Sequence, residues 1–285
     1  MSILGTGTKE DPYIVSTWEE IVSQCGIADV YVKCIPNLEI NMNTSYRFGA
    51  TSITLNCAEW DGNGVIIKNG YWHNTPIFTM TIATNITKVI KNISFLNTYT
   101  DTSLFQMKGN YAMLLHLINI TITGFHTGSD AMFRINAKQG NVPTLLEGCS
   151  FNLNNPNGAV ADSYYSDYHP TFDNCFIKWN GTHFGDASNS GSGAPILKSS
   201  RIDGKIGDSS NSTYLYFSCS NSIINASGAQ ISWTGNNAGT SHVIYNSDLI
   251  SSGSSQQGGV TGLTTEQLKD ASTVAATGFP IYVEE

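Results

Sequence analysis

This chain of 285 residues carries little charge, because only 13% of its residues are Asp, Glu, Lys or Arg. Acidic residues outnumber basic ones by 22 to 14, which gives a formal net charge of −8 and leaves no basic stripe. Nucleic acids and anionic membrane surfaces are recognised by clustered Lys and Arg, so the composition argues against both as partners. No apolar run approaches the about 20 residues that a membrane span requires.

Motifs for metals, cofactors and common nucleophiles are also missing. The six cysteines, at positions 25, 34, 57, 149, 175 and 219, do not show the CxxC spacing of metal sites. HExxH, GxSxG and nucleotide-binding loops do not occur. We therefore expect no metal and no cofactor, and we expect the cysteines to be small buried hydrophobic residues rather than disulfides.

What the chain does contain is a repeat. In each of eight copies a small polar anchor residue lies two positions after one apolar residue and three positions before another. The anchors are Asn69, Asn92, Asn119, Gly148, Asn174, Ser199, Asn221 and Asn246, at spacings of 23, 27, 29, 26, 25, 22 and 25 residues. Repeats of about 20–30 residues are typical of solenoids.

The spacing within the repeat predicts a bend in the backbone. The two apolar positions are five apart, so they cannot share one face of a flat strand, and a bend at the anchor would return both to the interior. Asn and Gly tolerate the left-handed conformation that such a bend needs. The position after the anchor is small or aliphatic, as in Gly70, Cys149 and Cys175, which suits a crowded inner corner. We expect the anchors to be buried and stacked as a ladder, with parallel strands about 4.8 Å apart.

Over roughly residues 30–250 this pattern resembles the right-handed parallel β-helix of the pectate-lyase-like type, in which stacked Asn residues form a ladder at one corner. The resemblance implies an all-β fold built as a single-chain solenoid. The alternative is a β-sandwich rich in Asn and Thr, and eight aligned anchors argue against it.

Four segments are expected along the chain. They are a first strand and amphipathic capping helix at 1–28, the β-helix at 29–250, a Ser/Gly-rich linker at 251–262, and a tail at 263–285. In the first segment Ser16 and Glu19 have the spacing of a capping box, and Gly26 would end the helix. The tail begins with a short predicted helix, and it either caps the last coil or contacts a neighbouring subunit.

Enzymes of this fold family place clustered carboxylates on one outer sheet face, and glycoside hydrolysis needs two of them within about 5–10 Å. The expected outer column Thr79, Gln106, Arg134 and Ala161 contains no carboxylate, which counts against an enzyme. The remaining weak candidates form a loop-rich patch: Asp162, Asp167, His169 and Asp173, with Arg134 one coil below. These residues could form an acid/base set or a Ca²⁺ site, but we favour a solvated loop.

The same part of the chain is rich in aromatic residues. Glycan-binding candidates are Tyr164, Tyr165 and Tyr168 in the loop and Trp179 on the next coil. Such side chains can stack on sugar rings, or they can pack the loop against the solenoid, and the sequence leaves both alternatives open.

The opening segment GTGTKEDPYIV is similar to those of bacteriophage tailspike-type and bacterial surface β-helix modules. This resemblance implies a non-enzymatic structural or receptor-binding virion module, a homotrimer that contacts other virion proteins and presents loops to a host-surface polysaccharide. No secretory signal peptide is visible, which favours a virion protein made in the host cytoplasm. The alternatives are a polysaccharide-degrading depolymerase, acting as a lyase or glycoside hydrolase, and a bacterial surface or secreted adhesin.

Overall fold

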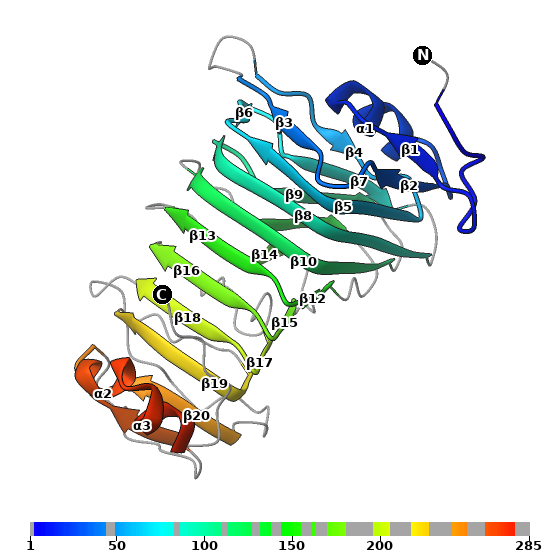
Figure 1. Cartoon of the computed structure of the whole chain (residues 1–285). Coiled ribbons are helices and arrows are strands. Elements are labelled where there is room, and N and C mark those ends of the chain that lie inside the picture. Colours follow the sequence, from blue (N-terminus) through cyan, green and yellow to red (C-terminus); the bar gives the residue numbers. More distant parts are fainter. Residues whose placement is uncertain are drawn as a thin grey trace.

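A computed structural model describes residues 3–43, 49–82, 86–109, 113–126, 132–137, 144–154, 161–163, 170–180, 196–205, 218–227, 241–249 and 260–276. Coils of strands stack in sequence order from helix α1 (Trp18–Cys25) at one end to α2 (Thr265–Lys269) and α3 (Ala271–Ala276) at the other (Figure 1). The strand pairs of both sheets run parallel. The predicted parallel β-helix is confirmed.

Two sheets wrap the solenoid. Within the described ranges, the larger one has 16 strands and the smaller one has 5. The strands of the larger sheet are β1 (Tyr13–Val15), β2 (Tyr31–Cys34), β3 (Glu39–Asn41), β5 (Glu59–Lys68), β6 (Tyr71–Trp72), β8 (Ile86–Thr100), β10 (Met113–His126), β12 (Thr144–Glu147), β13 (Ser150–Asn154), β15 (Thr171–Asp173), β16 (Phe176–Asn180), β17 (Ile196–Lys198), β18 (Arg201–Lys205), β19 (Ser218–Ser227), β20 (Ser241–Asn246) and β21 (Val260–Leu263). Those of the smaller sheet are β4 (Ile53–Thr54), β7 (Phe78–Ile82), β9 (Phe105–Gly109), β11 (Phe133–Ala137) and β14 (Ala161–Ser163).

The apolar positions of the repeat fill the interior. All eight residues two positions before an anchor are buried, and so are seven of the eight residues three positions after one. The exception is Leu249 in the last copy, which is 41% exposed. On the smaller sheet, Phe105 stacks between Phe78 and Phe133 with ring centroids 4.6 and 4.9 Å away. Stacked side chains on successive coils thus form one continuous core.

Seven anchors bend the chain as predicted but face outward, whereas Asn246 is buried. Seven of the eight have a left-handed backbone, with φ between 46° and 60°, and Asn246 does not. Asn119, Asn174 and Asn221 are exposed, so the expectation of a buried Asn ladder is wrong. A left-handed residue turns its own side chain out of the corner, and the next residue turns in.

The inner corner is lined by the residue after each anchor. Cys149 and Cys175 are buried there as free thiols, in register on neighbouring coils. Ser200 and Ser222 continue the column, and the Oγ atom of each accepts a hydrogen bond from a backbone N–H of the preceding coil. Ser200 Oγ accepts from Cys175 N–H, and Ser222 Oγ accepts from Ser200 N–H, both at 3.1 Å. These side chains satisfy buried backbone groups that the bend takes out of the strand ladder.

Strand register corrects the position of two anchors. Asn69 lies opposite Asn97 rather than Asn92, and the Asn97 amide donates to Asn69 Oδ1 at 2.6 Å. The register shifts in β5, which places the turn around Asn63 below Asn92. Asn246 is also displaced, since its partner on the coil below is Asn225. The repeat is therefore in register from Asn92 to Asn221 only.

Helix α1 covers the first coil, as predicted. Its buried face includes Trp18, Ile21 and Cys25, and it ends at Gly26. The N-cap lies one residue later than predicted, and no reciprocal capping box forms. Thr17 is the N-cap, accepting from Glu20 N–H, and the Glu20 carboxylate accepts from Ser16 N–H at 2.7 Å.

The last coil is covered by α2 and α3. Leu268 and Val274 of these helices form a small apolar cluster with Ile223, Ile244 and Leu263. Residues 260–262, expected at the end of the linker, belong to strand β21 instead. None of the helices in the described ranges has the length and apolarity that crossing a membrane requires.

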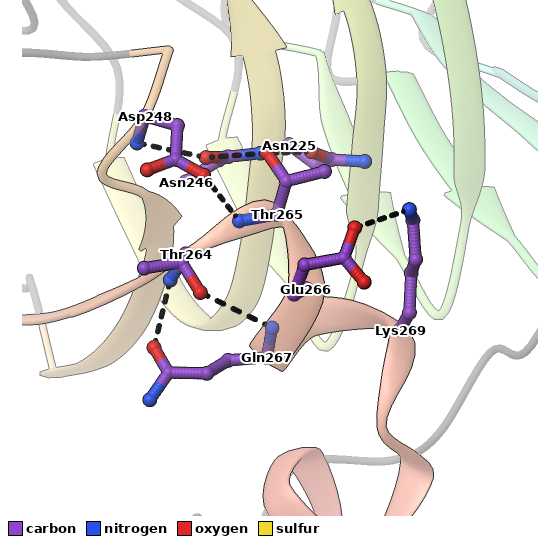
Figure 2. Close-up of polar contacts among 8 residues, drawn as sticks. All are labelled: Asn225, Asn246, Asp248, Thr264, Thr265, Glu266, Gln267 and Lys269. Atoms are coloured by element: carbon purple, nitrogen blue, oxygen red, sulfur yellow. Dashed lines mark hydrogen bonds and ion pairs between the residues drawn. The ribbon is translucent and has the colours of Figure 1, made fainter.

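The displaced anchor Asn246 fastens this cap (Figure 2). Its buried amide donates to Asn225 Oδ1 at 2.8 Å and to Thr265 Oγ1 at 3.0 Å. Asp248 N–H donates to Asn246 Oδ1, and Asp248 Oδ2 in turn accepts from Thr265 N–H at the start of α2. Thr264 and Gln267 complete a capping box. The final anchor thus connects the solenoid to its closing helices.

Candidate functional site

The loop-rich patch predicted around residues 162–173 is only partly described. Asp167, His169, Tyr164, Tyr165 and Tyr168 lie outside the described residues. Asp162 lies in β14 of the smaller sheet and Asp173 in β15 of the larger one, so the backbone places them on different sheets.

The outer column of the smaller sheet differs by one residue from the sequence prediction. Thr79, Gln106 and Arg134 are neighbours as expected, but the residue opposite Arg134 is Asp162 rather than Ala161. The column therefore does contain a carboxylate residue. The prediction was wrong because it assumed a spacing of 27 residues after Arg134, whereas its partner Asp162 follows 28 residues later in the sequence.

Trp179 is not a surface residue. It lies in β16 and its side chain is 0% exposed, within the main apolar core. A sugar ring in solvent cannot reach a side chain in this position, so Trp179 is withdrawn as a glycan-binding candidate. The alternation of β16 decides the matter, because Ile177 and Trp179 both point inward.

A second carboxylate column lies immediately before the anchors, where the sequence analysis did not look. Glu147 and Asp173 are paired in register on neighbouring coils, and Lys198 follows Asp173 on the next coil. His116 Nε2 lies 2.7 Å from Glu147 Oε2. In-register neighbours in a sheet are about 4.8 Å apart, so two carboxylate residues share one outer face. Reading the position before each anchor as a column would have found them.

Beside this column, a shallow groove of about 380 Å³ follows the outside of the corner. Its lining is Asn63, Gly64, Asn92, Ile93, Ser94, Asn119, Thr121 and Gly148. None of these residues is charged. The groove is built by the left-handed anchors and by the outward-facing residues two positions after them, so it crosses several coils.

Hydrogen bonds between coils fix the amides of the groove. Asn119 Nδ2 donates to Asn92 Oδ1 at 3.2 Å, and Asn92 Nδ2 donates to Asp61 Oδ1 at 3.0 Å. Ser94 and Thr121 form a parallel column of hydroxyls, paired in register. At the end of the groove nearer the C-terminus, Gly148 interrupts the amide column, because it has no side chain.

Charged residues beside the end of the groove nearer the N-terminus form ion pairs. Lys91 Nζ lies 2.7 Å from Glu59 Oε1 and 3.7 Å from Asp61 Oδ2. The hydrogen bond to Glu59 raises the pKa of Lys91, against an opposing effect of burial. The groove lining therefore presents amides and hydroxyls, and the one cation beside it is shared by two carboxylates.

No three His, Cys, Asp or Glu residues in the described ranges come close enough to hold a metal ion. Family models, curated proteins and solved structures were compared with this chain, and none of them matches it.

Proposed function

We propose that this protein is a structural, receptor-binding β-helix module that holds a glycan against its outer surface. The observation that carries the proposal is the uncharged groove along the corner, where amide and hydroxyl groups recur from coil to coil. Sugars offer hydroxyl groups that both donate and accept hydrogen bonds, and amides and hydroxyls match them. The stacked core and the two covered ends support a stiff scaffold for such a surface.

By resemblance to tailspike-type modules, we propose a setting in a bacteriophage virion, as a homotrimer joined to other virion proteins, with a bacterial surface or secreted adhesin as the alternative. Sedimentation of the purified chain tests the trimer directly. A species of three times the 30.8 kDa chain mass is expected, and a monomer at micromolar concentration would contradict it.

The test of glycan recognition is binding of the whole protein to an array of bacterial surface polysaccharides. Binding should survive moderate salt, since a neutral groove gains little from ionic attraction. A folded protein that binds no glycan on the array would refute the proposal.

A second candidate function is cleavage of the bound glycan, favoured by the Glu147–Asp173 pair beside the groove. Two carboxylates on adjacent coils can act as acid and base or as acid and nucleophile. Release of reducing ends from a bound polysaccharide, lost in Glu147→Gln and in Asp173→Asn, would establish an enzyme. Binding without release supports the non-enzymatic module.

A further inference from the structure

We infer that the groove binds a neutral, linear glycan that lies along the solenoid axis with one hexose ring over each coil. The groove consists of Asn63, Asn92, Asn119 and Gly148 on successive coils, flanked by Ser94 and Thr121. This inference rests on the proposed function and names the ligand and its orientation.

The orientation follows from the direction of the repeat. Matching polar groups recur along the axis on the coils of Asn92 and Asn119, about 4.8 Å apart. An extended chain of hexoses advances by a similar length with each ring, so the rings over the coils of Asn92 and Asn119 meet the same pair of groups: the amide of the anchor and the hydroxyl two positions later, in Ser94 or Thr121. An extended peptide repeats its side chains on one face every two residues, or about 6.6 Å, and loses register with the coils.

The neutral character of the ligand follows from the lining. No charged side chain lines the groove, and Lys91, beside the end nearer the N-terminus, already forms an ion pair with Glu59. At the end of the groove nearer the C-terminus, Glu147 directly precedes Gly148. An anionic glycan would gain no cationic partner among these residues and would approach the Glu147 carboxylate, so uronate chains are disfavoured.

Gly148 leaves the groove open at the end nearer the C-terminus. A Cβ atom at this position would lie 3.3 Å from Asn119 Oδ1, so the glycine leaves that carbonyl oxygen uncovered. Its φ of 60° is one that Asn also adopts at this corner, as Asn119 and Asn174 show. An Asn at 148 would therefore extend the amide column and occupy the space that we assign to a sugar ring.

Three variants separate binding from folding. Gly148→Asn fills the open end with a residue type that adopts this φ at neighbouring corners, so the protein should still fold while binding weakens about tenfold or more. Thr121→Tyr blocks the middle of the groove with a residue that strands accept. Thr54→Tyr is the control, because Thr54 is exposed on β4 of the other sheet.

The experiment is isothermal titration of the whole protein with the neutral oligomers cellohexaose and mannohexaose, and with hexagalacturonate as the charged comparison. We expect one of the neutral oligomers to bind, binding to fall at least tenfold in Gly148→Asn and Thr121→Tyr, and Thr54→Tyr to match the unchanged protein. Equal binding by all four proteins would overturn the groove assignment and leave glycan binding intact. Preference for the uronate, or groove-dependent binding of an extended peptide instead, would overturn the ligand class. No binding of any sugar here or on the polysaccharide array would refute the proposed function as well.

Discussion

Replacing Ser200 by Ala tests whether the inner corner column holds the coils together. Ser200 is 2% exposed, and its Oγ accepts a hydrogen bond from Cys175 N–H at 3.1 Å. Its O–H donates to the carbonyl oxygen of Lys198 at 2.7 Å, with that of Phe172 at 3.1 Å as the other acceptor in reach. Alanine removes both hydrogen bonds and leaves the Cys175 N–H without its partner in a buried corner. An unsatisfied buried backbone group costs about 1–3 kcal/mol, so we expect Ser200→Ala to lower the free energy of unfolding by about 2 kcal/mol.

Chemical denaturation measures the total loss, and amide hydrogen exchange locates it. Solenoids can open locally, so faster exchange should centre on Cys175 and its neighbours rather than spread over all coils. Ser94→Ala is the matched control, because Ser94 is a half-buried outward-facing serine, and exposed-face changes stay within about 0.5 kcal/mol. If Ser200→Ala and Ser94→Ala have equal effects, the inner column does not stabilise the corner.

Three further predictions concern the bend, the cap and the thiols. Asn221, with φ of 47°, should accept Gly within about 0.5 kcal/mol, whereas Val should cost about 1–2 kcal/mol in thermal denaturation; equal costs would contradict a left-handed corner. Asn246→Ala removes the buried amide that joins Asn225 to Thr265, so limited proteolysis should release α2 and α3 first, and an unchanged cleavage pattern would contradict this role. Burial raises the pKa of Cys219 to about 12 from the ordinary value of 9.0, so the unfolded thiol ionises before the folded one. The free energy of unfolding should therefore fall as pH rises from about 9 to about 12, with a smaller slope in Cys219→Ala, and equal slopes would argue against this contribution.

The architecture was predictable because the repeat reports backbone geometry directly. Asn and Gly at the anchors predicted left-handed bends, and seven of the eight positions have them. The direction in which the anchors point was not predictable from the apolar spacing alone, since a bend at the anchor buries both flanking residues whichever way the anchor faces. The buried Ser200 and Ser222 show the inward position instead.

Register was the weaker part of the sequence interpretation. Asn69 and Asn246 match the pattern locally, but pairing depends on the lengths of loops and bulges, which the spacing does not contain. For the same reason Ala161, rather than Asp162, was predicted to pair with Arg134 in the outer column. Glu147 and Asp173 each directly precede an anchor, so their pairing was predictable from the sequence. It was missed because the position before each anchor was not compared from coil to coil.

The account depends most on the claim that the outward corner is a binding surface while the inward column is scaffold. Hydrogen–deuterium exchange of the protein, free and saturated with its best-binding neutral hexasaccharide, tests that claim directly. We predict added protection in the segments 61–66, 92–97 and 119–124, which share the groove on successive coils. Protection confined to the opposite sheet, around Thr79, Gln106 and Arg134, would contradict it.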